Sequence, residues 1–288
     1  MCRLMSWLRW SVFPLLFGGS AVVAACCHTP DHIGWLMPLL LGSVLLLAFV
    51  LERLLPFAAE WNQGQGRAGD LVYLGLTTVS VHVAEALVWA LVLMAATSWI
   101  PLVSTWWPQT WPLWLQVLLA VALGDLLPYF YHRASHETGG WLWRVHAVHH
   151  APQRLYSLNF ARFHPLNAAL TAGLTLLPLA LLGVPERVLF VAAVLHNVHG
   201  VLSHANIDVR LGWLNRIFSM AELHRWHHAR DLSLANGNYG ATLALWDWLF
   251  GTRRDPGRAV AATAVGLAAV PSQAPPRAPW RCCGNALA

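Results

Sequence analysis

Long apolar runs constrain the fold of this chain more than any other feature of its sequence. Residues 10–27, 33–51, 71–95 and 113–131 each approach the roughly 20 apolar residues that a helix needs to cross a bilayer. The 288-residue chain is 57% hydrophobic and only 11% charged, and its mean hydropathy is +0.50. This composition excludes an ordinary soluble domain and predicts an integral membrane protein.

Two shorter apolar runs, residues 166–182 and 187–204, follow further along the chain. The turn-like sequence Gly-Val-Pro-Glu at 183–186 separates them, so together they predict a tight helical hairpin. Residues 258–288 are rich in alanine and proline without periodicity, which predicts a disordered tail. The fold class expected from this pattern is all-α: a polytopic membrane helix bundle with four to six spanning or hairpin helices.

Arginine placement predicts the orientation of these helices. All 18 basic residues are arginine, and the net charge is +5. If the N-terminus is cytoplasmic, the arginines before the first run, after the second and after the fourth all lie in the cytoplasm, as the positive-inside rule requires. The charge is modest and scattered, which argues against nucleic acid as a partner. The arginines concerned are Arg3, Arg9, Arg53, Arg67, Arg133, Arg144, Arg154 and Arg162.

Histidines fall into short clusters with helical spacing. The chain contains 15 histidines; one cluster has the spacing i, i+4 and two have i, i+3, i+4, which places each cluster on one helix face. A tetrahedral metal site takes about four ligands, so eight clustered histidines indicate two metals. All-nitrogen ligation suits iron, copper, zinc or nickel and leaves the choice open. The eight are His132, His136, His146, His149, His150, His224, His227 and His228.

The stretch HNVHGVLSH at the end of the run 187–204 adds His196, His199 and His204. On an ideal helix His199 and His204 diverge by about 140°. If both are ligands, that helix must be distorted or must end there. With a cytoplasmic N-terminus, every histidine cluster lies at the cytoplasmic ends of the apolar runs.

Several motifs in this order resemble those of the fatty acid hydroxylase (sterol desaturase) superfamily of membrane-bound di-iron oxygenases. The resemblance covers about residues 70–252, and the ordered set is far more specific than any one histidine box. The matching segments are DLLPYFYHRASH (125–136), WRVHAVHH (143–150), RFHP (162–165), SHAN (203–206), HRWHH (224–228), GNYG (237–240) and WDWLFGT (246–252).

The resemblance implies an oxidoreductase that hydroxylates or desaturates a membrane lipid, such as a sterol, a fatty acyl chain or a sphingoid base. It implies two non-haem iron ions as cofactors, O2 as co-substrate, and an external electron donor such as a cytochrome b5-like protein or a ferredoxin with its reductase. The resemblance also implies a cytoplasmic histidine-rich helical cap that would hold the metal ions. The expected location is the bacterial inner membrane, with the metal site on the cytoplasmic side. Trp143 and Arg144 would belong to the interface where the donor docks.

The same resemblance implies a division of the chain and a set of ligands. Residues 1–60 would be N-terminal membrane helices outside the match, 61–257 the hydroxylase-like catalytic domain, and 258–288 the tail. Carried over position by position, the implied iron ligands are His132, His136, His146, His149, His150, His204, His224, His227 and His228, with His199 as a tenth.

Three polar residues are candidates for orienting these ligands. Asp125, Tyr129 and His132 lie at i, i+4 and i+7 on one helix face. A ligand histidine usually donates its second N–H to a carboxylate or a carbonyl, and Asp125 and Asp247 are the candidates for that role. Asp247 could instead cap a helix or pair with an arginine. Asn238 could orient a histidine or make a turn.

Three further ionisable residues have open roles. His164 precedes Pro165 and either touches metal or only begins a helix. His82 and Glu85 lie three residues apart within the run 71–95, where ionisable groups are candidates for function. They are either a hydrogen-bonded pair lining a substrate channel or a structural tie between helices.

A membrane metal transporter or metal-binding protein is the alternative function. Transporters place coordinating groups near the bilayer midplane, often at broken helices. Here the histidine clusters lie beyond the ends of the apolar runs, and acidic residues along a cation path are scarce. Both observations favour the oxygenase.

Overall fold

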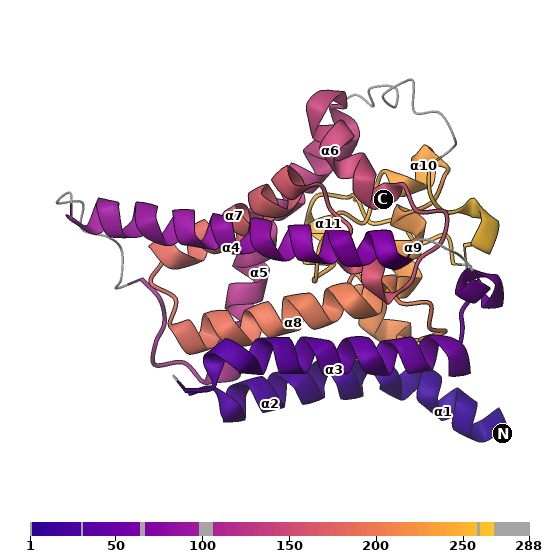
Figure 1. Cartoon of the computed structure of the whole chain (residues 1–288), viewed down its shortest axis with the longest axis horizontal. Helices are drawn as coiled ribbons and strands as arrows, with labels where there is room; N and C mark the ends of the chain where they lie inside the picture. The colour runs from indigo at the N-terminus through magenta and orange to yellow at the C-terminus, as the bar shows by residue number, and fades with distance from the viewer. Residues whose placement is uncertain (1, 30, 64–66, 98–105, 258–259, 268–288) are drawn as a thin grey trace, which may run out of the picture.

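The computed structural model describes residues 2–29, 31–63, 67–97, 106–257 and 260–267. This part of the chain is helical, and three isolated bridges are its only extended pairings. Long helices lie side by side and short helices gather toward one end of them (Figure 1). The helices of the bundle are α1 (Cys2–Phe13), α2 (Gly19–Cys27), α3 (Ile33–Leu54), α4 (Arg67–Thr97), α5 (Leu113–Glu137), α7 (Pro165–Leu181) and α8 (Glu186–His204).

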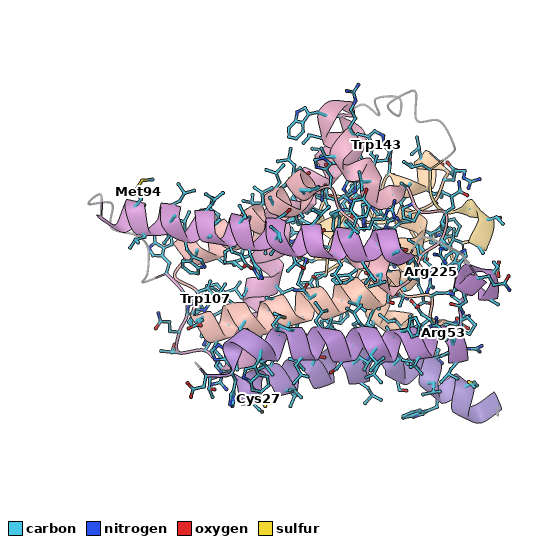
Figure 2. The ribbon with its side chains drawn as sticks, viewed as in Figure 1. Cys27, Arg53, Met94, Trp107, Trp143 and Arg225 are labelled. Carbon is cyan, nitrogen blue, oxygen red and sulfur yellow. The ribbon has the colours of Figure 1, made fainter. Side chains whose placement is uncertain are left out.

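Four helical stretches are long and apolar enough to cross a membrane, as expected from the four long runs. They are Met5–Cys27, Gly34–Leu54, Ala68–Ala95 and Leu113–Glu137. Figure 2 shows Cys27, Met94 and Trp107 at one end of the bundle, and Arg53 and Arg225 toward the other.

A π-helical turn, η1 (Pro14–Gly18), joins α1 to α2 inside the first of these stretches. Pro14 has no backbone N–H, so the regular helical hydrogen-bond pattern cannot continue through it. The rings of Phe13 and Phe17 stack 4.9 Å apart across this turn. Both rings also lie edge-on to the imidazole of His199 on α8.

The two shorter runs form the predicted helical hairpin. α7 ends at Leu181, Gly183 follows with a φ of 69°, and Pro185 caps the start of α8. α8 lies among α2, α3 and α5 and is buried along most of its length. Helices from the first 60 residues therefore share one hydrophobic core with the hairpin.

The helices α3 and α4 expose large apolar side chains such as Leu46 (65%), Val79 (62%) and Leu93 (68%). In a chain with four candidate spans, these are the surfaces expected to face lipid. His82 and Glu85 lie on this outer surface, where the His82 Nδ1 is 2.9 Å from the Glu85 Oε2. The predicted pair exists, but its side chains are 72% and 45% exposed, so it neither lines an interior channel nor ties α4 to another described helix.

The cap consists of short elements at the end of the bundle where α5 stops and α4 begins (Figure 1). Its helical character agrees with the expectation from the sequence. The elements are η2 (Ala59–Gln63), α6 (Gly140–His150), η3 (Ser157–Ala161), η4 (Gly212–Arg216), α9 (Ala221–His227), α10 (Leu232–Ala235), α11 (Leu245–Leu249) and η5 (Ala262–Ala264).

Part of the predicted disordered tail packs on this cap. Val260 and Val265 are buried against Leu155 and Trp226, and the Gly266 N–H donates to the His228 carbonyl at 3.0 Å. The prediction of disorder is wrong for residues 260–267, because two apolar side chains anchor them. The rest of the predicted tail, 258–259 and 268–288, lies outside the described residues.

Candidate metal centre

Nine buried or nearly buried histidines from four separate segments converge inside the cap. His132 and His136 end α5, one helical turn apart, and three more histidines end α6. His204 is the last residue of α8, and the remaining three lie on α9 and directly after it. The helical spacing in each segment points its imidazoles in one direction, as predicted from the sequence.

The nine histidines divide into two groups, each with the side-chain composition of a metal site. Within each group the candidate ligand nitrogens all lie within 4.8 Å of one another. The rings of His150 and His228 stack 4.3 Å apart, so the two groups are neighbours. The five-histidine group is His132, His136, His146, His150 and His227, and the four-histidine group is His149, His204, His224 and His228.

The spacing of the nitrogens fits a shared metal ion. In the four-histidine group, the Nε2 of His204 is 3.1 Å from that of His149 and 2.9 Å from that of His224. In the five-histidine group, the Nε2 of His150 is 3.0 Å from that of His146 and 3.2 Å from that of His136. Two nitrogens bound at right angles, about 2.1 Å from one metal ion, are about 3.0 Å apart.

Hydrogen bonds at the opposite ring nitrogens assign the tautomers of three histidines. Nδ1 of His132 donates to the Tyr239 carbonyl at 2.8 Å, and Nδ1 of His204 donates to the Gly200 carbonyl at 2.8 Å. Nδ1 of His227 donates to the Gly237 carbonyl at 2.9 Å. A neutral imidazole that donates from Nδ1 has a lone pair on Nε2, which is the form that binds metal.

Two of these lone pairs have no partner among the described residues. The Nε2 atoms of His132 and His227 are buried and unbonded. An unsatisfied buried polar atom is costly, and a cation at the centre of the group would satisfy both. The donor set therefore fits a metal ion bound by neutral imidazoles.

Burial keeps the cap histidines neutral. Desolvation first, and neighbouring imidazoles second, lower the pKa of His149, His224 and His228 well below the usual 6.5. His150 and His227 show the same direction for the same reasons. Neutral imidazoles are ready to bind metal at neutral pH.

We expect the metal-free protein to lose stability as the pH falls below about 6.5. The unfolded chain binds protons on these histidines below that pH whereas the folded chain does not, so the free energy of unfolding falls by up to about 1.4 kcal/mol per pH unit for each imidazole. Thermal unfolding of the metal-free protein in detergent at about pH 8, 6.5 and 5 measures this. A midpoint that stays constant between about pH 6.5 and 5 would contradict neutral burial.

The structure does not bring His199, the expected tenth ligand, into either group. α8 remains a regular helix through both residues, so His199 and His204 point in different directions. His199 is 1% exposed and packs edge-on against Phe13 and Phe17. His196 is also outside both groups and contacts the Thr242 hydroxyl at 3.1 Å.

Neither Asp125 nor Asp247 accepts a hydrogen bond from a histidine of the two groups, contrary to expectation. The Asp125 Oδ2 accepts the backbone N–H groups of Thr242 and Leu243, at 2.9 and 3.0 Å. Its nearest histidine nitrogen is the Nδ1 of His196, at 3.8 Å. Asp125 thus fastens the segment after GNYG to α5.

Asp247 instead acts on the ligands through the backbone. It accepts the N–H groups of Tyr239 and Gly240, both at 2.8 Å, and the Thr252 hydroxyl at 2.6 Å. The Tyr239 carbonyl in turn accepts the N–H of His132. The Asp247 carboxylate therefore fixes the turn at Tyr239, and the carbonyl of Tyr239 orients the His132 imidazole.

Asn238 makes a turn, the second of its two expected roles. Its φ of 55° is left-handed, a conformation that asparagine tolerates. Its side-chain amide donates to the carbonyls of Leu223 and Arg254, at 3.3 and 2.8 Å. Next to the turn, a Cβ at Gly240 would lie 2.2 Å from the Leu243 carbonyl oxygen, so only glycine fits there.

Comparison with known proteins identifies the family. The model of the Fatty acid hydroxylase family matches residues 117–252. Ornithine lipid hydroxylase OlsE from Rhizobium tropici is 37% identical over 241 residues, which are 82% of this chain and 72% of the relative. The chain belongs to the fatty acid hydroxylase/sterol desaturase superfamily. The predicted resemblance is confirmed.

Two further relatives align with about half of the chain. Alkylglycerol monooxygenase from Danio rerio is 32% identical over 51% of this chain and 31% of its own length. Very-long-chain aldehyde decarbonylase GL1-8 from Oryza sativa subsp. indica is 34% identical over 49% of this chain and 52% of its own. No solved structure matches. The relatives give no support to the alternative of a metal transporter.

Asn167 is a residue of this hydroxylase-family site that sequence reasoning missed. Its Oδ1 is 3.1 Å from the Nδ1 of His146 and accepts the Tyr131 hydroxyl at 3.0 Å. It is 2% exposed, three residues after His164 at the start of α7. The sequence signal for this role was a polar residue, Asn167, in the first turn of the otherwise apolar helix α7. His164 lies outside both groups and caps this helix by accepting the Leu166 N–H, the second of its expected roles.

Glu52 directly follows the apolar run 33–51, yet it is 1% exposed. Its Oε1 accepts the backbone N–H of Ser157 at 2.6 Å and that of Asn206 at 3.2 Å. Glu52 therefore joins α3 to the segment after α6 and to the segment after α8. The helices α6 and α8 both carry candidate metal ligands.

Trp143 is buried, contrary to its expected place on a docking surface. Its ring lies 5.2 Å from that of His136 and 5.8 Å from that of His150, so it covers the five-histidine group. Arg144 beside it is exposed. The helical turn of α6 explains the difference, because neighbouring residues on a helix face about 100° apart.

Proposed function

We propose that this chain is an O2-dependent di-iron hydroxylase acting on a membrane lipid. The observation that carries the proposal is the pair of adjacent histidine groups, in which nitrogen lone pairs face one another about 3 Å apart. Membership of the superfamily favours iron over the other metals that suit imidazole. The five-histidine group would hold one ion and the four-histidine group the other.

The chain's own residues would position and protect this centre. When bound, two irons supply the redox chemistry that activates O2 for attack on a C–H bond. The Tyr239, Gly237 and Gly200 carbonyls hold three imidazoles with Nε2 directed inward. Trp143, Phe163 and their apolar neighbours cover the imidazoles, since Phe163 stacks on His149 at 4.3 Å. Such a cover excludes water from a strong oxidant.

The overall reaction needs two electrons and two protons. The substrate C–H bond and O2 become C–OH and water, so O2 is reduced and the carbon is oxidised. We propose that a separate protein supplies the electrons, either a cytochrome b5-like donor or a ferredoxin with its reductase. Arg144 is exposed next to the cover and would belong to the surface that receives it.

The relatives narrow the proposed substrate to lipids with a polar headgroup. The Rhizobium tropici relative, named as an ornithine lipid hydroxylase, aligns with most of this chain. The Danio rerio relative is named as an alkylglycerol monooxygenase and aligns with about half. We therefore place an acylated amino acid or glycerol lipid ahead of a sterol.

We propose an inner-membrane location with the cap in the cytoplasm. Arg53, Arg133 and Arg154 lie at the end of the bundle that carries the cap, whereas among the described arginines Arg187 alone lies at the opposite end. Positive residues accumulate on the cytoplasmic side of bacterial membrane proteins. The four candidate spans fit an integral membrane protein.

The protein purified without oxygen and reconstituted with ferrous iron is expected to hold two irons per chain, one for each histidine group. Given a reductase system, lipid extract and isotopically labelled O2, it should yield a lipid that carries one labelled oxygen atom. Elemental analysis and lipid mass spectrometry provide the two measurements. Iron-loaded, reduced protein that incorporates no label into any lipid would overturn the proposal.

A further inference from the structure

A polar pair interrupts the apolar surface of α4 in the middle of its candidate span. His82 and Glu85 are hydrogen-bonded to each other, and their side chains are 72% and 45% exposed. The span runs from Ala68 to Ala95, so its ends lie 14 residues before His82 and 10 residues after Glu85. At 1.5 Å per residue these separations are about 21 Å and about 15 Å, and the hydrocarbon of a bilayer is about 30 Å thick. The pair therefore lies close to the middle of the membrane.

This position is unfavourable for a polar pair that faces lipid. Hydrocarbon offers no hydrogen-bond partner, and ionisable side chains inside a membrane almost always face protein or a water-filled cavity. Within the chain, α4 lies over α7, its main neighbour, and buries Ala84 and Val88 (Figure 1). His82 and Glu85 remain on the uncovered surface. We therefore expect a second protein helix to cover them.

Each side chain keeps one polar atom that has no hydrogen bond among the described residues. The Nδ1 of His82 and the Oε2 of Glu85 lie 2.9 Å apart and share a proton, which leaves the Nε2 of His82 and the Oε1 of Glu85. A net charge in hydrocarbon is costly, so the pair is either an imidazole with an acid or an imidazolium with a carboxylate. In the first form the acid donates to Nδ1 and the imidazole carries its hydrogen on Nε2; in the second both ring nitrogens carry hydrogen. In both forms Nε2–H is a donor and Oε1 is an acceptor.

A second copy of this chain supplies the matching groups. Two copies inserted in the same direction and related by a two-fold axis along the membrane normal place every residue at the same depth. His82 and Glu85 are three residues apart, about 4.5 Å along the helix, so each copy presents a donor and an acceptor within reach of the other. Gly75 and Ala86, seven residues before and four residues after His82, are small and exposed on the same face, which permits two helices to approach closely.

We infer that α4 is the interface of a homodimer in the membrane, in which the Nε2–H of His82 in each copy donates to the Oε1 of Glu85 in the other. The two intermolecular hydrogen bonds are identical, as a two-fold interface requires. The α4 surface around the pair faces protein in this dimer and not lipid. Each copy keeps both of its histidine groups, so the dimer does not depend on the proposed function.

Removing either polar group should weaken the dimer about 10- to 100-fold, because each substitution deletes both intermolecular hydrogen bonds. The variants are His82→Leu and Glu85→Leu, which extend a surface that is already apolar. His32→Leu is the matched control, since His32 directly precedes α3 and lies outside the four candidate spans. The full chain with one fluorophore per copy is reconstituted in phosphatidylethanolamine–phosphatidylglycerol liposomes at falling protein-to-lipid ratios, and stepwise photobleaching counts the copies in each particle.

Exchanging the two residues tests the pairing itself. His82→Glu has two carboxyl groups on this face and Glu85→His has two imidazoles, so each variant alone should be mostly monomeric. Mixed in two colours, the two variants should form heterodimers, because the carboxyl groups of one copy then meet the imidazoles of the other. The double variant His82→Glu/Glu85→His restores one group of each kind and should dimerise about as tightly as the wild type.

The expected result is equal dimerisation of the wild type and His32→Leu, with both leucine variants shifted toward monomers. A wild type that stays monomeric at every protein-to-lipid ratio would overturn the inference, even if another membrane protein covers this face in cells. Leucine variants that dimerise as tightly as the wild type, or exchange variants that form no heterodimer, would contradict the pairing of His82 with Glu85. Heterodimers in the mixed sample also show that the exchange variants are folded.

Discussion

Replacing His149 or His227 by alanine should lower lipid hydroxylation more than about 100-fold and reduce the iron content from two ions to one. Each substitution removes one imidazole from a different group, His149 from the four-histidine group and His227 from the five-histidine group. Each variant is loaded with iron without oxygen, and the iron per chain and the hydroxylated lipid formed are then measured. Membrane insertion should be unchanged, because both residues lie in the cap and outside the four candidate spans.

The matched controls are His199→Ala and His164→Ala, the same substitution at histidines that belong to neither group. Both should retain two irons per chain. His199 is buried between helices, so that variant tests whether mere loss of a buried imidazole explains the effect. Full activity in His149→Ala and His227→Ala, or loss of iron in His199→Ala, would contradict the division into two groups.

Replacing Asp247 by alanine should weaken iron binding in the five-histidine group about 10- to 100-fold, although Asp247 touches no histidine of either group. The variant leaves the N–H groups of Tyr239 and Gly240 without their acceptor, at about 1–3 kcal/mol each. The turn that presents the Tyr239 carbonyl to His132 would then move. Iron titration followed by competition with a chelator measures the affinity, and thermal unfolding measures the stability.

Asp255→Ala is the control for this variant, since Asp255 is an exposed aspartate nearby that pairs with Arg253 at 2.8 Å. It should change neither affinity nor stability measurably. Asp247→Asn keeps an oxygen that can accept one N–H and should fall between the wild type and Asp247→Ala. If Asp247→Ala melts earlier but binds iron as tightly as the wild type, the route through Tyr239 to His132 is wrong.

The histidine groups could be predicted from the sequence because their geometry is mostly local. The spacing within 146–150 and within 224–228 places three imidazoles on one side of a single helical turn. The same local argument cautioned against pairing His199 with His204, and the structure bears out that caution. The four candidate spans could also be predicted from the apolar runs, because a segment that crosses a membrane must satisfy its own backbone hydrogen bonds and therefore forms a helix.

The partners of the ligands were harder to predict because they come from distant segments. Asp125 accepts a hydrogen bond from Thr242, which is 117 residues away in the sequence, and helical spacing predicts contacts only between residues a few positions apart. The acceptors of His132, His204 and His227 are backbone carbonyls. Every residue has a backbone carbonyl, so the residue type does not indicate which one accepts the hydrogen bond. From the sequence, the Asp247 carboxylate was therefore the expected acceptor of a histidine N–H. In the structure it instead accepts the backbone N–H groups of the turn at Tyr239 and Gly240.

The segment 224–228 contributes histidines to both groups, with His227 in one and His224 and His228 in the other. During translation this segment emerges after all four candidate spans and after the hairpin of α7 and α8. A nascent chain that stops before residue 224 lacks ligands for both ions at once. Neither group can therefore offer its complete set of ligands to a metal ion until the four candidate spans have been synthesised.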